Sequence, residues 1–336
     1  MSNGRNGGEQ TFPEEQICTA LAQGTMPTDA KGLVGRRCPR RECGKYFKLK
    51  PGTGLKGDVP CHCPYCGFRG DSDNFWTHDQ KEYVKAVAMN HASQELHKML
   101  KRCEFDYKPS GGFGISVSME VTGSPQRFHH RYRERELETD VVCDRCTLVY
   151  AIYGAFAFCP DCALHNSLTI LRKNLEIAEK LLSLAATQER EVAEHLVGDA
   201  LENIVSAFDG FGREICRVAA PRATSPSAAE DVRFQSLVGA RRRLLKLFGF
   251  DLMLFVSNPD WDFACRCFQK RHLLAHKMGV IDEEYVQATK DPAAVVGRKV
   301  QIRPEEAKRL TDVISQLGEK LAAHLIPPPP ATSPRS

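Results

Sequence analysis

The stretch CDRCTLVYAIYGAFAFCPDC, from Cys143 to Cys162, decides how this chain is organised. Its two CxxC pairs, Cys143 with Cys146 and Cys159 with Cys162, have the spacing with which proteins hold a structural zinc ion. Because thiolates would fill all four coordination positions, none stays open for catalysis, and the site is expected to be structural. The apolar run 147–158 is expected to form a hairpin that turns near Gly154 and packs against the helices that follow.

An earlier cysteine cluster shows a second, less regular zinc pattern. Its members are Cys38, Cys43, Cys61, Cys63 and Cys66. The strong half is the CPYCG turn at 63–67, in which two thiolates can bind one metal while backbone amides point at sulfur. We predict that the ligands are Cys38, Cys43, Cys63 and Cys66 and that Cys61 is the spare, although Cys61 or His62 can substitute. Unliganded core cysteines are the alternative.

The 14 cysteines and the polar start of the chain point to a reducing compartment. The opening residues MSNGRNGGEQ lack the apolar centre of a signal peptide, and no apolar run approaches the ~20 residues of a membrane helix. The sequence therefore predicts a cytoplasmic protein without a membrane partner. Two zinc–tetrathiolate sites would reduce the formal net charge of +4 to roughly zero, so no global attraction to polyanions is expected.

Positive charge is nevertheless concentrated around the first cluster. Residues 31–56 contain nine Lys or Arg and one Glu, with Tyr46 and Phe47 among them. Basic residues interleaved with aromatic ones are typical of a nucleic-acid surface. A solvated face that offsets the thiolate charge is the alternative.

The two halves of the chain have different periodicities. Apolar residues at helical spacing predict a helix over 77–103, and alternation predicts a strand over 115–121. From 168 onward the pattern is helical, with helices expected over 168–182, 197–215, 232–248, 259–278 and 304–325 and a loop over 221–229. Short connections between these helices predict a bundle.

Together these features predict an α+β multidomain protein. The expected parts are a disordered N-terminus (1–30), a zinc-ribbon-like module (31–75), a helix plus β segment (76–140), a second zinc ribbon (141–166), an all-α bundle (167–326) and a disordered Pro-rich tail (327–336).

The helix predicted over 259–278 carries the sequence Arg271-His272-Leu-Leu-Ala-His276. Asn258 or Ser257 can cap its start, and Gly279 lies where a helix commonly stops. Arginine holds phosphate through a planar fork of donors, and histidine exchanges a proton near neutral pH. On a regular helix His272 and His276 share a face, whereas positions 271 and 276 lie about 140° apart.

This motif, with its helical context, resembles the HEPN superfamily (higher eukaryotes and prokaryotes nucleotide-binding). The resemblance covers 167–326 and includes the stretches ALENIVSAFDGFG at 200–212 and GRKVQI at 297–302. It implies a homodimer that cleaves RNA without a catalytic metal and leaves a 2′,3′-cyclic phosphate. His276 would then act as general acid or base, Arg271 would clamp the phosphate, and His272 would orient the substrate.

Two alternatives to a catalytic site stay open for these residues. Arg271 can pair with an acid while His276 is satisfied in the core, or His272 and His276 can form half of a metal site. At the level of function, a zinc-ribbon endoribonuclease acting as toxin or antiviral effector competes with a non-catalytic RNA- or nucleotide-binding module. It also competes with a scaffold whose zinc ribbons recruit other proteins.

Overall fold

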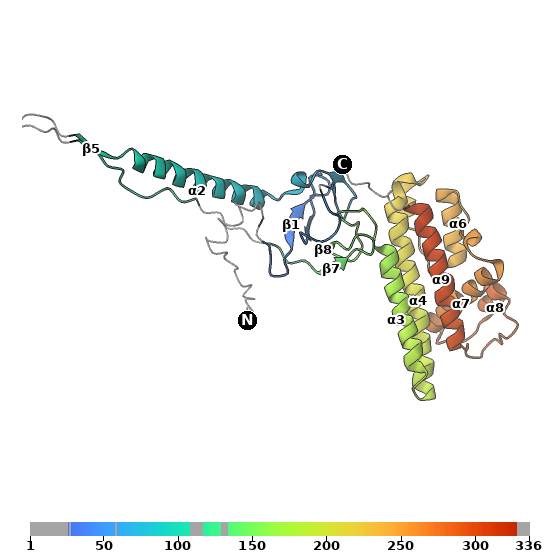
Figure 1. The fold of residues 1–336 in the computed structure, drawn as a ribbon. Helices are drawn as coiled ribbons and strands as arrows, with labels where there is room; N and C mark the ends of the chain where they lie inside the picture. The colour runs from blue at the N-terminus through green and yellow to red at the C-terminus, as the bar shows by residue number, and fades with distance from the viewer. Residues whose placement is uncertain (1–25, 27, 58, 108–116, 129–133, 328–336) are drawn as a thin grey trace, which may run out of the picture. The chain divides into compact units, whose positions relative to one another are not determined.

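The computed structural model describes residues 26, 28–57, 59–107, 117–128 and 134–327 (Figure 1). Most of the predicted N-terminal disorder and of the Pro-rich tail lies outside these residues. The chain divides into two compact units, one ending at Ala155 and the other beginning at Phe156, and each is described by itself. No helix in the described part has the length and apolarity required to cross a bilayer.

The first unit is built on a four-stranded antiparallel sheet with strand order β1-β2-β8-β7. The strands are β1 (Val34–Arg37), β2 (Tyr46–Leu49), β7 (Thr139–Val142) and β8 (Val149–Ile152). Two shorter antiparallel pairs accompany it: β3 (Cys61–His62) with β4 (Arg69–Gly70), and β5 (Phe105–Tyr107) with β6 (Val117–Met119). A short 3₁₀ helix, η1 (Ser72–Phe75), follows β4.

The predicted hairpin over 147–158 is wrong in its placement. The turn lies at Cys143–Cys146, because β7 precedes that pair and β8 follows it, and Val142 pairs with Val149. Gly154 has a positive φ of 79° but lies beyond the end of β8. The first cluster follows the same rule, since β1 and β2 flank residues 38–43 and β3 and β4 flank residues 63–66.

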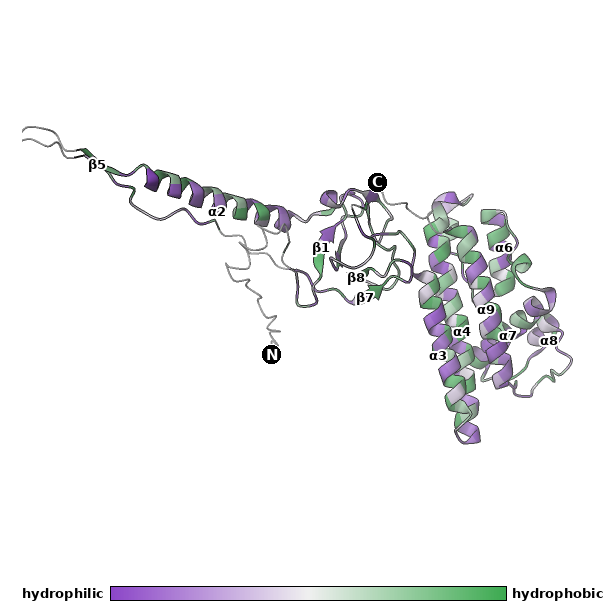
Figure 2. Cartoon of the chain, viewed as in Figure 1, coloured by the Kyte–Doolittle hydropathy of each residue, from purple (hydrophilic) through white to green (hydrophobic). Residues whose placement is uncertain are grey.

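The long helix α2 (His78–Arg102) forms where the sequence predicts a helix. A reciprocal capping box fixes its start: the Thr77 hydroxyl accepts from the Gln80 amide, and the Gln80 side chain accepts from the Thr77 amide. Gln80 also donates to the carbonyl of Gly35 at 2.8 Å, which ties α2 to β1. Apolar residues continue along α2 (Figure 2), but none of its residues beyond Val87 is buried.

The second unit is a helical bundle, as predicted for this half. Its helices are α3 (Ser167–Ala185), α4 (Arg190–Ala219), α5 (Pro226–Glu230), α6 (Leu237–Phe248), α7 (Asn258–Lys277), α8 (Glu283–Thr289) and α9 (Pro304–Leu325), with 3₁₀ turns η2 (Ala220–Arg222) and η3 (Leu252–Phe255). α3, α4 and α9 pack against one another, and α7 contacts both α4 and α9.

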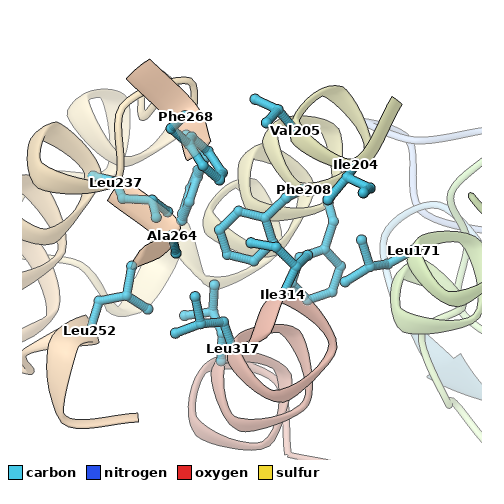
Figure 3. Close-up of a cluster of buried hydrophobic side chains, with 14 of the residues drawn as sticks. Leu171, Ile204, Val205, Phe208, Leu237, Leu252, Ala264, Phe268, Ile314 and Leu317 are labelled. Atoms are coloured by element: carbon cyan, nitrogen blue, oxygen red, sulfur yellow. The ribbon is translucent and has the colours of Figure 1, made fainter. Parts of the chain in front are cut away.

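Phe208 of α4 lies at the centre of the bundle core (Figure 3). Its ring makes edge-to-face contacts with Phe234 and Phe268 at centroid distances of 5.5 and 6.4 Å. Gly212 is required beside this cluster, because a Cβ there would lie 2.5 Å from the Phe234 ring. Gly318 of α9 is required for the same reason, because a Cβ there would lie 2.5 Å from the Leu171 side chain of α3.

Several segments of the bundle differ from the sequence prediction. Helix α4 begins at Arg190, before the expected residue 197, and α8 is not among the expected helices. The expected loop over 221–229 contains the end of η2 and most of α5. The helix expected from Val232 begins only at Leu237, where the Ser236 hydroxyl accepts from the amide of Gly239. Phe234 stays outside the helix because its amide donates to the buried carboxylate of Asp209, 2.6 Å away.

Candidate functional site

Two groups of four cysteines in the described residues can each hold a metal ion. They are Cys38, Cys43, Cys63 and Cys66, and Cys143, Cys146, Cys159 and Cys162. In each group the four sulfur atoms lie within 4.8 Å of one another. These are the same eight cysteines that the sequence spacing selects.

The distances in the first group fit zinc. The sulfur atoms of Cys38 and Cys66 are 3.7 Å apart, and so are those of Cys43 and Cys63. Four thiolates at ~2.3 Å from a tetrahedral zinc ion would be separated by about 3.8 Å, so these atoms are already at the required spacing. An all-thiolate set of this geometry favours zinc or iron–sulfur over hard cations such as Mg²⁺.

A repeated backbone turn places the thiols. In the second half of the first group, the amide of Cys63 donates to the carbonyl of Phe68, and the amide of Gly67 donates back to the carbonyl of Cys63. The residue after the second cysteine of each pair has a positive φ, which turns the chain back on itself. These residues are Gly44, Gly67, Thr147 and Ala163, with φ of 53°, 68°, 62° and 55°.

Burial explains why these thiols need a cation. Burial raises the pKa of Cys38 to about 11 and raises that of Cys63 further, since an isolated thiolate is poorly solvated there. All four cysteines of the second group are buried. A bound cation would provide the positive charge that stabilises thiolates in such surroundings.

Cys61 and His62 are buried in β3 but belong to neither group. The Cys61 sulfur instead lies 3.9 Å from the backbone carbonyl of His62. The four remaining thiols satisfy the geometry without them.

The motif helix α7 is fixed at both ends. Ser257, one of the two predicted caps, accepts a hydrogen bond from the amide of Asp260, and Pro259 lies in the first turn. Met278 and Gly279 both have positive φ, and the Gly279 amide donates to the carbonyl of Leu273, which ends the helix at Lys277.

Arg271 forms a bidentate ion pair with Glu202 of α4. Its Nε and Nη2 donate to the two carboxylate oxygens at 2.5 and 2.7 Å. The Arg271 side chain is 10% exposed, whereas that of Glu202 is 44% exposed. The hydrogen bonds from Arg271 lower the pKa of Glu202, and burial opposes this shift. The charges of Arg271 and His276 also lower it. The carboxylate therefore stays ionised within electrostatic range of His276.

His272 and His276 are both exposed and lie side by side on α7. Their ring centroids are 4.8 Å apart, as expected for positions i and i+4. Within the described residues no third ligand completes a metal site with them, because the two cysteine groups are the only sets of suitable size. The pair is accessible to a ligand from solvent.

The three motif residues thus have separate environments. The acid-paired alternative describes Arg271, but His276 is exposed and not satisfied in the core. The sequence does not identify Glu202 as the partner of Arg271, although Glu202 lies within the stretch 200–212 that is part of the family resemblance. A polar residue beside the apolar stripe of α4 was the only local sign, and it does not identify a partner 69 residues away.

We find no protein-family model, curated protein or solved structure that matches this chain. Its function is therefore inferred from its own residues.

Proposed function

We propose that the protein is a metal-independent endoribonuclease of HEPN type, acting as a homodimer, with His276 as general acid or base. His272, to which the resemblance gives an orienting role, is in this proposal the second proton-transfer group. One observation supports this proposal above all: two exposed imidazoles lie 4.8 Å apart beside an ion pair that keeps a carboxylate charged. RNA contains its own nucleophile, the 2′-hydroxyl, so acid–base groups suffice and a metal is not required.

The proposed step is a transesterification. One imidazole takes the proton of the 2′-hydroxyl while the 2′-oxygen bonds to phosphorus. The bond from phosphorus to the 5′-oxygen breaks, and the other imidazole, which is protonated at the start, gives its proton to that oxygen. The products are a 2′,3′-cyclic phosphate and a free 5′-hydroxyl.

Arg271 has a positioning role in this proposal. Two of its donors are bound to Glu202, so it fixes that carboxylate near His276 and orients α7 against α4. Direct phosphate clamping, the role implied by the resemblance, requires the phosphate to displace Glu202 from the guanidinium.

We also propose that both cysteine groups hold structural Zn²⁺. The sulfur–sulfur distances of 3.7 Å support this metal in the first group, and the paired CxxC spacing supports it in the second. In neither group do we expect catalysis, because four thiolates leave no coordination position open.

Cleavage of a mixed RNA pool by the zinc-loaded protein tests the nuclease. A brief EDTA exposure removes loosely bound metal and leaves structural zinc in place. Wild type is expected to leave cyclic phosphate ends, and His276→Ala to cut at least about 100-fold more slowly. Equal cleavage by wild type and His276→Ala, or none by a wild-type dimer, would overturn the proposal.

A second candidate, a non-catalytic RNA-binding module, is favoured by the occupied donors of Arg271. It differs in one outcome: RNA binds but stays intact, and binding survives His276→Ala. A protein scaffold, the third candidate, predicts neither binding nor cleavage.

A further inference from the structure

Five exposed cations surround the first cysteine group. Each lies within three residues of one of its four cysteines, and they are Arg37, Arg40, Arg41, Lys45 and Arg69. We call this set the basic rim. By the same criterion only one carboxylate, Glu42, accompanies them. A zinc tetrathiolate adds a charge of about −2, so positive charge remains in excess.

The basic rim lacks carboxylate partners, unlike several other cations of the unit. Lys31 pairs with Asp140 at 2.6 Å, and the buried Lys48 pairs with Asp29 at 2.7 Å. Within the described part of the chain, none of the five rim residues forms such a pair, and only Arg37 has a side-chain donor bound to the backbone, its Nε to the carbonyl of Gly44 at 3.0 Å. Unpaired, exposed arginines and lysines are the groups that bind phosphate oxygens.

Two rim residues also lie over aromatic rings, one in the CPYCG turn and one directly after it. The Arg40 guanidinium carbon is 5.7 Å from the centroid of Phe68, and Lys45 Nζ is 5.1 Å from that of Tyr65. The Tyr65 ring is held in place, because its hydroxyl donates to the carbonyl of Tyr46 and accepts from the amide of Tyr153. Phe68 is held against Phe75 at 6.0 Å.

From this geometry we propose that the basic rim binds single-stranded RNA, with phosphates on the free cations and bases stacked beside Arg40, Phe68 and Tyr65. Arginine planes and aromatic faces are the platforms on which unpaired bases stack. An acidic peptide would use the charges but not the platforms. The choice of RNA rests on the proposed function, whereas the binding surface does not depend on cleavage.

Salt-dependent binding of a fluorescein-labelled oligouridine to the full zinc-loaded protein tests this. Every measurement uses the His276→Ala background, so cleavage cannot affect the signal. The rim variant is Arg40→Gln/Arg41→Gln/Lys45→Gln. The matched control is Lys81→Gln/Lys101→Gln/Arg102→Gln, which removes the same charge from exposed positions of α2 that form no ion pair. Zinc content and circular dichroism must match the parent in both.

The rim variant is expected to bind at least 10-fold more weakly at low salt. Its slope of log affinity against log salt should be shallower by about 2, because single strands lose ~0.7 per phosphate contact. The control should keep the parent slope. Equal weakening in the control, an unchanged rim variant, or equal displacement of RNA by polyglutamate at matched charge would each overturn the proposal. If the wild-type protein binds an RNA pool but never cuts it, the nuclease proposal is contradicted, whereas the proposal for the basic rim still holds.

Discussion

Arg271 and Glu202 join α7 to α4 through two parallel hydrogen bonds of 2.5 and 2.7 Å, with the arginine buried and the carboxylate half exposed. Next to them on the same two helices, Leu274 lies 3.8 Å from the position of a Cβ on Gly198. Close packing and a bidentate pair together fix the rotation of the motif helix. The orientation of His272 and His276 follows from that rotation.

Replacing Glu202 by Gln should destabilise the bundle by about 1–2 kcal/mol. The loss arises because a buried guanidinium is left without its counter-charge, reduced by the partial exposure of the carboxylate. Urea unfolding measures it. Glu194→Gln is the control. Its partner Arg190 is 91% exposed, so this substitution should change stability by less than ~0.5 kcal/mol. Equal losses in the two variants would contradict a structural role for the Arg271 pair.

Mixing two inactive variants should restore no cleavage. His272 and His276 lie side by side on one helix, so we expect acid and base to come from the same chain. His272→Ala and His276→Ala would be unfolded together, refolded and assayed against each alone. Recovery to about a quarter of wild-type activity would show instead that the pair is shared between two copies.

The stability of the second unit should fall in acid because of Glu214. Burial alone raises the pKa of Glu214, but hydrogen bonds from Arg217 and His165, and their charges, lower it to about 2. His165 lies 3.2 Å from the carboxylate, which is 9% exposed. A carboxyl with a lowered pKa stabilises the fold fully above its usual value near 4.5, and this stability is lost as pH falls toward 2.

The expected loss between pH 5 and 2 is up to about 3 kcal/mol. It is measured as the difference between wild type and Glu214→Gln, because loss of the proposed zinc in acid would affect both equally. The buried Trp261 reports unfolding of this unit if Trp76, the other tryptophan, is replaced by Phe. Parallel pH curves for wild type and Glu214→Gln would refute the assignment.

Local chemistry explains which features the sequence could predict. The cysteines of a CxxC pair share a metal because the turn between them is short, so the second group follows from spacing. In the first group spacing favours the four cysteines found, but it leaves Cys61 and His62 as alternatives. The caps of α7 are equally local, and Ser257 and Gly279 lie where the sequence predicts them. The helical stripes identify α3, α4, α6, α7 and α9, although the starts of α4 and α6 are misplaced and α8 is not identified.

Long-range contacts explain what the sequence could not predict. Phe234 leaves its helical pattern because Asp209, 25 residues earlier, binds its amide. Nothing in the sequence around Arg271 indicates that its partner is Glu202 and not a phosphate. The predicted hairpin over 147–158 is wrong because the CxxC turn at 143–146 itself joins two strands. Val149 therefore pairs with Val142, which precedes it, and not with a residue beyond Gly154.

Replacing Cys63 by Ser should remove one of two bound zinc ions, whereas Cys61→Ser should retain both. Cys63 belongs to the first metal group, and the equally buried Cys61 does not. Zinc released by a thiol-reactive mercurial and measured with a chromogenic chelator gives the stoichiometry. Loss of zinc in the Cys61 variant alone would assign Cys61 as the ligand.

The turns after each cysteine pair predict an asymmetry between the two groups. Gly67→Ala should cost about 1–2 kcal/mol, because φ of 68° is unfavourable for a residue with a Cβ. Ala163→Gly should change stability by less than ~0.5 kcal/mol, because relief of the same strain at φ 55° is offset by the greater freedom of glycine in the unfolded chain. Urea midpoints and zinc retention against a competing chelator measure both. If Ala163→Gly proved as costly as Gly67→Ala, the methyl group of Ala163 would contribute packing that outweighs its backbone strain.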